Sequence, residues 1–173
     1  MSISFPIIFL DIDGVVNNDA ILFHSHKMFE YNYFDDPMLV DSSMIGEELV
    51  ELVNRIIRRT GAKVVLSSAW RLKNIAGTPR TLAALRHRGF TGEIIDETPV
   101  FKQPQEYSYD LRTVRGAEIH DWLSRHTEVT SWVVLDDNLI GITPQWRFIQ
   151  TDPMVGISKA NVNEAVKVLR RSW

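Results

Sequence analysis

Short apolar runs alternate along this chain with segments in which apolar residues recur every three or four positions. A continuous apolar run is typical of a strand buried on both faces of a sheet, as in 5–10 and in the last three residues of the predicted strand 63–66. Further strands are predicted over 93–95, 132–135 and 148–149. The spacing of three and four predicts helices instead. Their expected ranges are 43–60, 78–89, 115–126 and 158–171.

Residues that favour capping stand at the ends of these helices. Residues 41–43, Asp-Ser-Ser, are candidates to cap the first long helix, which Gly61 can end. Thr78 and Pro79 suit the cap and the first position of the next helix. Ser158 is expected to cap the last one.

The order of strands and helices predicts the fold. Strict alternation favours an α/β, Rossmann-like, three-layer α/β/α architecture with a central, mostly parallel five-stranded sheet and a minimal cap. The length suits one domain over residues 1–173. Residues 17–42 are expected to form a short cap or loop insertion, because 17–40 look irregular and rich in aromatics. A second long polar loop is expected over 96–114.

The aromatic residues of the insertion have two interpretations. They could stack on a nucleic-acid base, or they could pin the loop to the body of the protein. The residues concerned are Phe29, Tyr31, Tyr33 and Phe34.

Composition narrows the class of protein. Hydrophobic residues make up 45% and charged residues 24%, as in ordinary globular proteins. The absence of cysteine excludes disulfides, thiolate zinc sites and cysteine nucleophiles. The N-terminus lacks a basic region before its short apolar stretch, and no uncharged run is long enough to span a bilayer, so we expect a cytoplasmic protein without a membrane partner. The net charge of -3 does not favour a dedicated nucleic-acid binder.

Acidic and hydroxyl residues follow three of the predicted strands. They are Asp11 and Asp13, then Ser67, then Asp136 and Asp137. Ligands of open parallel sheets bind beyond the carboxyl ends of the strands, so we expect one converging site. The carboxylates would repel one another without a cation, and oxygen ligands with no Cys or His nearby select a hard ion. The sequence therefore predicts a Mg²⁺ site.

The segment 11–15, Asp-Ile-Asp-Gly-Val, suits chemistry on phosphorus. Its two carboxylates, Asp11 and Asp13, can flank one phosphorus atom, so that one attacks while the other handles a proton. Gly14 permits a tight turn and a close approach of backbone amides to phosphate oxygens.

Residues after the second strand complete the predicted phosphate site. One of Ser67 and Ser68 can cap a helix while the other binds phosphate, and we favour Ser67 as the phosphate ligand. Arg71 lies near the expected mouth of the site, where it is predicted to contact the phosphate or the backbone. Trp70 is predicted to pack in the interior.

Three segments resemble signature motifs of the haloacid-dehalogenase (HAD) superfamily. Residues 11–15 after an apolar strand resemble the first motif, and Val-Val-Leu-Ser67 resembles the second. Val-Val-Leu-Asp136-Asp137 resembles the fourth. The motifs stand in family order and span residues 5–137.

This resemblance implies a phosphatase and a role for each residue. Asp11 would attack phosphorus and form an aspartyl-phosphate, while Asp13 would protonate the leaving oxygen and then activate water. Asp11, the backbone carbonyl of Asp13 and Asp136 would bind Mg²⁺, with Asp137 supporting that shell. Ser67 would donate a hydrogen bond to a phosphate oxygen. An aspartate at position 13 favours a phosphatase over a dehalogenase.

The third signature departs from the family pattern, which places a lysine before the fourth motif. The best match is Arg115, which opens the segment Arg-Gly-Ala-Glu-Ile. Arginine can bind phosphate bidentately but is not equivalent to lysine. Lys102 and Arg112 are the alternatives.

A narrower resemblance concerns segments 66–71, 115–119, 132–137 and 151–158, which are similar to a small HAD subgroup associated with RNA-repair proteins. It implies a 3′-phosphatase acting on nucleic-acid ends, or a nucleotide phosphatase. The expected partner is therefore a phosphorylated substrate, and no obligate protein partner is inferred. Two alternatives stay open: a non-catalytic HAD-like module that binds phosphorylated ends, and a phosphotransferase that passes phosphate from Asp11 to an acceptor other than water.

Overall fold

The computed structural model describes residues 5–30, 36–101, 111–129 and 131–171. Its sheet has five parallel strands in the spatial order β3-β2-β1-β4-β5. The strands are β1 (Ile7–Leu10), β2 (Lys63–Leu66), β3 (Ile94–Glu97), β4 (Trp132–Asp136) and β5 (Phe148–Gln150). The predicted α/β architecture is confirmed, and the sheet is parallel throughout.

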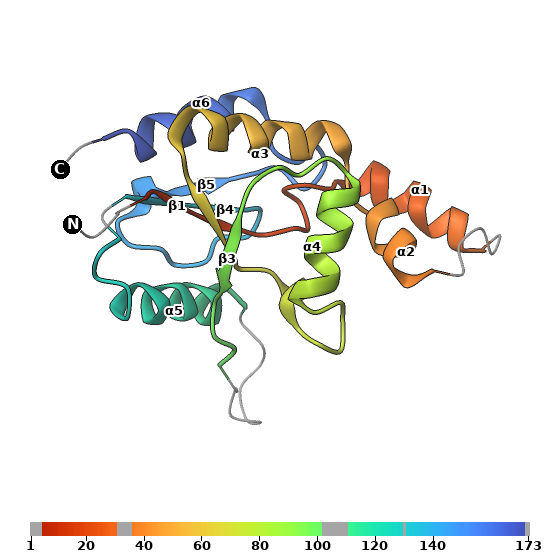
Figure 1. Ribbon diagram of the computed structural model, residues 1–173, viewed down its shortest axis with the longest axis horizontal. Helices are drawn as coiled ribbons and strands as arrows, with labels where there is room; N and C mark the ends of the chain where they lie inside the picture. The colour runs from red at the N-terminus through yellow and green to blue at the C-terminus, as the bar shows by residue number, and fades with distance from the viewer. Residues whose placement is uncertain (1–4, 31–35, 102–110, 130, 172–173) are drawn as a thin grey trace.

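Helices cover both faces of the sheet and give three layers (Figure 1). They are α1 (Asp19–Glu30), α2 (Pro37–Ser43), α3 (Glu47–Thr60), α4 (Thr78–His87), α5 (Leu111–Ser124) and α6 (Lys159–Leu169), with two 3-10 turns, η1 (Ala69–Arg71) and η2 (Gln145–Arg147). Figure 1 shows α3 and α6 together on one face and α5 on the other. The helix α4 packs on the α3 face, because its Ala84 and Leu85 belong to the same buried cluster.

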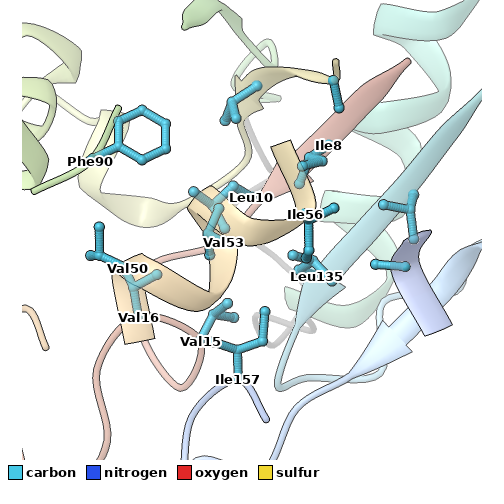
Figure 2. Close-up of a cluster of buried hydrophobic side chains, with 14 of the residues drawn as sticks. Ile8, Leu10, Val15, Val16, Val50, Val53, Ile56, Phe90, Leu135 and Ile157 are labelled. Carbon is cyan, nitrogen blue, oxygen red and sulfur yellow. The ribbon is translucent and has the colours of Figure 1, made fainter. Parts of the chain in front are cut away.

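Two buried clusters fill the space between the layers. Figure 2 shows the larger one, in which Leu10 of β1 and Ile56 of α3 meet side chains from β4 and from the turns after the strands. On the other face, Phe9 packs edge-on against Trp122 and Trp132, with ring centroids 5.4 and 6.0 Å away. Neighbouring residues of β1 thus enter opposite clusters, so the strand is buried on both faces, as its unbroken apolar run predicts.

The helix α3 follows its sequence signals except at its start. Its buried side chains are Val50, Val53, Asn54 and Ile56. Gly61 ends the helix in the left-handed conformation, with φ of 70°, as predicted. The N-cap is Gly46, so the prediction of a cap at residues 41–43 is wrong. Those residues belong to α2 instead.

The expectation of an irregular segment over 17–40 is wrong for most of its length, because α1 and α2 lie there. Local side-chain caps hold both helices. Asn18 Oδ1 accepts a hydrogen bond from the first turn of α1 at 3.0 Å, and Asp36 caps α2 at 2.8 Å. The hydroxyls of Ser25 and Ser43 join the two helices at 2.7 Å. These caps and the contact between the two helices stabilise α1 and α2, which the polar and apolar pattern does not indicate.

Two arginines of the α4 region fasten this insertion to the body of the protein. Arg80 pairs with the buried carboxylate of Asp41, and Arg88 Nε donates to the carbonyl of Ser42 at 2.6 Å. In Figure 1, α2 accordingly lies beside α4 at one end of the molecule, and α1 lies beside α2.

Other boundaries differ by a few residues. Gly77 is the N-cap of α4, so Thr78 lies inside the helix. The helix α5 begins at Leu111, before the predicted start at 115, and so shortens the predicted loop 96–114. Ser158 caps α6 in a capping box with Asn161, as predicted. In the described part of the chain, no helix combines the length and apolar character needed to cross a membrane.

Candidate active site

The site forms where three strand ends meet. Asp11 follows β1, Ser67 follows β2, and Asp136 is the last residue of β4. The register aligns Leu10 with Leu66 on one side and with Leu135 on the other, so the three polar residues stand at one level. The strands that follow β1 in the sequence lie on one side of it, β2 and β3, and then on the other, β4 and β5, and such a switch point is where parallel sheets bind ligands.

The Asp11 carboxylate is buried and already has a cationic partner. Asp11 is only 3% exposed. Arg115 Nη1 donates to Asp11 Oδ2 at 2.5 Å and to Asp136 Oδ2 at 2.7 Å. The Ile12 amide donates to Asp11 Oδ1 at 2.8 Å. Burial raises the pKa of Asp11, and the charge of Arg115 opposes that rise.

Asp136 shares the same electrostatic setting. Burial, together with the negative charge of Asp11, raises the pKa of Asp136 to about 7, although Arg115 opposes the change. The Asn138 amide donates to Asp136 Oδ1 at 2.8 Å, which orients the carboxylate. Burial also raises the pKa of Asp137. The cluster therefore holds more carboxylates than Arg115 alone can neutralise.

The donor set fits a hard divalent cation. Carboxylate oxygens of Asp11, Asp136 and Asp137 all lie within 4.8 Å of one another. Oxygen ligands of this kind suit Mg²⁺, and a bound cation would relieve the repulsion between them. Among the described residues, the Asp13 side chain is not part of this group, so the prediction for Asp13 concerns its backbone carbonyl alone.

Two hydrogen-bond donors hold the carboxyl group of Asp13. The residue is exposed, unlike Asp11. Trp70 Nε1 donates to Asp13 Oδ2 at 3.0 Å, and Asn17 Nδ2 donates to Asp13 Oδ1 at 2.8 Å. A carboxyl group in this position can exchange protons with a bound substrate or with water.

The two serines after β2 have different surroundings. Ser68 caps η1 by accepting from the Trp70 amide at 3.3 Å, and its hydrogen bond to Asp11 lowers the pKa of that carboxyl. Ser67 Oγ is buried and has no hydrogen-bond partner within the described ranges. A buried hydroxyl of this kind is ready to donate to an oxyanion beside Asp11.

Comparison with known families agrees with this geometry. The family model for the HAD domain in Swiss Army Knife RNA repair proteins matches residues 7–162. The chain belongs to this HAD family. The match runs from the first residue of β1 into α6 and so includes all five strands. Neither the curated proteins nor the solved structures yielded a match.

Within the HAD domain, Arg115 occupies the place that sequence reasoning assigned to the third motif. Its guanidinium bridges Asp11 and Asp136 from α5. Burial alone would lower the pKa of Arg115, but the two carboxylates outweigh it and raise that pKa. Lys102 lies outside the described residues, as does the side chain of Arg112.

Of the two contacts predicted for Arg71, with the phosphate or with the backbone, the structure shows the second. The residue is 6% exposed and its guanidinium faces the protein interior. It pairs with Glu118 at 2.6 Å and donates to the carbonyls of Ser68, Thr98 and Pro99. Because these acceptors engage its N–H groups, Arg71 joins η1, α5 and the segment after β3 instead of binding a ligand.

The tight turn predicted at Gly14 is present, but its own amide has a partner within the protein. Its amide donates to Asn17 Oδ1 at 2.8 Å, so it is not directed at a phosphate. Its φ of 68° is a left-handed conformation, and a Cβ there would stand 2.6 Å from the Asp137 side chain. Glycine therefore allows Asp137 to pack against the turn of the first motif.

Sequence reasoning missed two partners of Asp13 and left one alternative untested. Neither Asn17 nor Trp70 stood out as a site residue, since nothing in their local spacing indicates a contact with Asp13. The aromatic residues for which base stacking and pinning of the loop were both open lie outside the described residues in the case of Tyr31, Tyr33 and Phe34, and so does the side chain of Phe29.

Removing the Ser67 hydroxyl should separate stability from activity. We expect Ser67→Ala to leave the free energy of unfolding unchanged or to raise it by up to about 1 kcal/mol, because it removes a buried hydroxyl that has no partner among the described residues. The same change should lower kcat/KM for phosphate release roughly 10- to 100-fold, through loss of a hydrogen bond to a charged oxygen. Urea denaturation and steady-state kinetics measure the two effects.

Thr98 provides a matched control for Ser67. Its Oγ1 is also buried without a hydrogen-bond partner among the described residues, but it follows β3, one strand farther from Asp11. Thr98→Val should therefore match Ser67→Ala in stability while retaining wild-type kcat/KM. Equal loss of activity in both variants would contradict the assignment of Ser67 to the phosphate.

Magnesium binding should depend on pH through Asp136. With a pKa of about 7 in the folded protein, against an ordinary value of 3.8, this carboxyl favours the folded state when protonated. The stability of the metal-free protein should thus fall as pH rises through this window and then level off. Mg²⁺ needs deprotonated ligands, so it should raise the melting temperature more at pH 8 than at pH 6.

Thermal melts with and without MgCl₂ measure this dependence. Asp136→Asn removes the titrating group and should weaken both the pH slope and the Mg²⁺ effect. A stabilisation by Mg²⁺ that is as large at pH 6 as at pH 8 would argue against a metal site at Asp136.

Proposed function

We propose that this HAD domain is a Mg²⁺-dependent phosphomonoesterase that works through an aspartyl-phosphate on Asp11. The observation that carries the proposal is the pairing of a buried Asp11 carboxylate with Arg115 at 2.5 Å, inside a cluster of three carboxylates. A buried, oriented carboxylate beside a cation is suited to attack a phosphorus atom. A purely structural turn would need neither feature.

The proposed reaction has two steps. Asp11 Oδ attacks phosphorus while the bond to the leaving oxygen breaks, and Asp13 gives its proton to that oxygen. A water molecule then attacks the phosphorus of the aspartyl-phosphate, Asp13 takes the proton from the water, and the bond to Asp11 breaks. Inorganic phosphate leaves, and both carboxyl groups return to their starting states.

The surrounding residues support charge on the phosphate. Ser67 Oγ, buried and unpartnered in the described part of the chain, would donate to one phosphate oxygen. Arg115 would share its guanidinium between Asp11 and the phosphate as negative charge moves. Bound through Asp11, the backbone carbonyl of Asp13 and Asp136, Mg²⁺ would neutralise charge that otherwise keeps phosphate away from the carboxylates.

We propose nucleic-acid 3′ ends or nucleotides as substrates. The description of the matching family names RNA repair, which supports a polynucleotide end. The exposed position of Asp13 supports a leaving group that extends away from the protein. A site with an exposed acid residue and a short cap would admit a bulky substrate, whereas a large cap would favour small metabolites.

A substrate panel tests the proposal. Phosphate release is measured with and without Mg²⁺ from p-nitrophenyl phosphate, 3′- and 5′-mononucleotides, and 3′- and 5′-phosphorylated RNA and DNA oligonucleotides. Selective release from 3′-phosphorylated oligonucleotides is the expected result. Selective release from mononucleotides would make the protein a nucleotidase. No release from any substrate would overturn the proposal and favour a module that only binds phosphorylated ends.

Labelled substrate separates hydrolysis from transfer. If phosphate passes from Asp11 to an acceptor other than water, the label appears in a new phosphorylated product when an alcohol or nucleoside is added. Hydrolysis leaves the label in inorganic phosphate alone.

A further inference from the structure

Trp70 connects the end of β2 to the predicted acid and base of the first motif. Its indole is buried, with the residue 5% exposed, yet its Nε1 reaches the exposed Asp13 and donates to Oδ2 at 3.0 Å. We propose that Trp70 is a positioning residue that holds the Asp13 carboxyl group in the orientation from which it protonates the leaving oxygen. This inference rests on the proposed phosphomonoesterase function.

Two donors together restrict the Asp13 carboxyl group. Asn17 Nδ2 holds Oδ1 at 2.8 Å, and Trp70 holds Oδ2. Asn17 is itself fixed, since its Oδ1 accepts from the Gly14 amide at 2.8 Å. With one donor on each oxygen, the carboxyl plane cannot rotate freely. Each oxygen still has a second lone-pair position, so one of them can carry the proton that goes to the substrate.

The backbone around Trp70 is equally well anchored. Ser68 caps the turn η1 in front of it, and the Trp70 carbonyl accepts from the Gly77 amide at 2.9 Å and from Thr81 Oγ1 at 3.1 Å. The indole therefore belongs to a turn that begins directly after Ser67. Ser67 and Trp70 both follow the end of β2. The predicted phosphate ligand and the residue that holds Asp13 therefore keep a fixed position relative to each other.

A packing role and a positioning role predict different kinetics. Buried indoles generally need a hydrogen-bond acceptor, so the bond to Asp13 alone does not establish a role in the reaction. General acid catalysis, however, matters most for a poor leaving group and little for one that departs as a stable anion. Loss of the Asp13 orientation should therefore cost more as the leaving group worsens. Loss of packing should affect all substrates alike.

The test compares kcat/KM on two substrates for wild type and Trp70→Phe. This constant includes only steps up to departure of the leaving group, so the later hydrolysis of the aspartyl-phosphate does not enter. With p-nitrophenyl phosphate, a good leaving group, we expect a loss of less than about 3-fold. With glycerol 2-phosphate, whose alkoxide leaves poorly, we expect a loss of roughly 30-fold, within the range of general acid catalysis.

Trp122 is a matched control. It is also a buried tryptophan, 1% exposed, and its Nε1 donates to an aspartate, Asp96 Oδ2, at 2.6 Å. This pair joins α5 to β3 and does not involve Asp13. Trp122→Phe should lower the melting temperature but keep the wild-type ratio of kcat/KM between the two substrates.

A closer analogue covers the case in which Trp70→Phe does not fold. Replacing Trp70 with 3-benzothienylalanine keeps the bicyclic shape and exchanges the N–H for sulfur, so only the donor is lost. It should reproduce the larger loss on glycerol 2-phosphate. Equal losses on both substrates, or no loss on either, would overturn the inference for Trp70. Absence of activity in the wild-type protein would instead overturn the proposed function, so the two failures are distinguishable.

Discussion

Asp11→Asn should abolish phosphate release, with kcat lower by about 10⁴-fold or more, as expected when a nucleophile is removed. The amide keeps the size of the carboxylate and can still accept the Ile12 amide hydrogen bond through its oxygen. It lacks the oxygen that would attack phosphorus. Phosphate release from p-nitrophenyl phosphate in Mg²⁺ measures the effect, and circular dichroism checks that the variant is folded.

Asp152→Asn is the control for this substitution. Asp152 also lies beyond a strand end, after β5, but its carboxylate accepts from the Met154 amide within a surface turn. The control should retain kcat within about 2-fold, since it changes only a turn. If Asp11→Asn kept more than about a tenth of wild-type kcat, attack by Asp11 would no longer be tenable.

Gly116→Ala should destabilise the fold and remove most of the activity. A Cβ at position 116 would lie 2.1 Å from the Ile140 carbonyl oxygen, which belongs to the backbone and cannot turn aside. Glycine to alanine in a helix normally gains about 1 kcal/mol. Here we expect the free energy of unfolding to fall by about 3 kcal/mol, because α5 must move away from the segment after β4.

The loss of activity follows from the position of Gly116 next to Arg115. A shift of α5 moves the guanidinium away from Asp11 and Asp136, so kcat/KM should fall roughly 100-fold. Urea denaturation and steady-state kinetics measure the two effects. Gly61→Ala is the control, since no atom of the described residues lies within 4 Å of its added Cβ and the left-handed backbone resists the change. We expect a cost of about 1 kcal/mol there, with unchanged kcat/KM.

Local pattern was sufficient for most of the sheet and for the helices that pack on it. The runs that became β1, β2 and β4 are uninterrupted and end in carboxyl or hydroxyl residues, which limits them to buried strands with a site at their ends. The stripe of α3 and the cap of α6 were also readable. Pattern failed for α1 and α2, because their stability comes from caps and from contacts with α4, such as Arg80 with Asp41.

The predicted site also contains residues that local sequence identified and a residue whose contacts it did not. Asp11, Ser67 and Asp136 were identified because each directly follows or ends an apolar strand, and parallel register then brings strand ends together. The sequence left open whether Arg71 contacts the phosphate or the backbone, because closeness to the site along the chain says nothing about which way a guanidinium points. In the structure, Glu118 and three backbone carbonyls accept the hydrogen bonds of the Arg71 guanidinium.

The sequence by itself determined the fold class, the order of the strands along the chain and the acidic residues at their ends. Burial and the end of a strand both depend on residue types at adjacent positions, so local sequence is sufficient to predict them. For the cation that faces Asp11, the family resemblance proposed Arg115 and left Lys102 and Arg112 open, and the tertiary structure places Arg115 there. The tertiary structure alone decided which donor holds Asp13. Arg115 is 104 residues from Asp11, and Trp70 is 57 residues from Asp13. No local spacing encodes such pairs, since the packing of α5 and of the turn after β2 against the sheet brings them together.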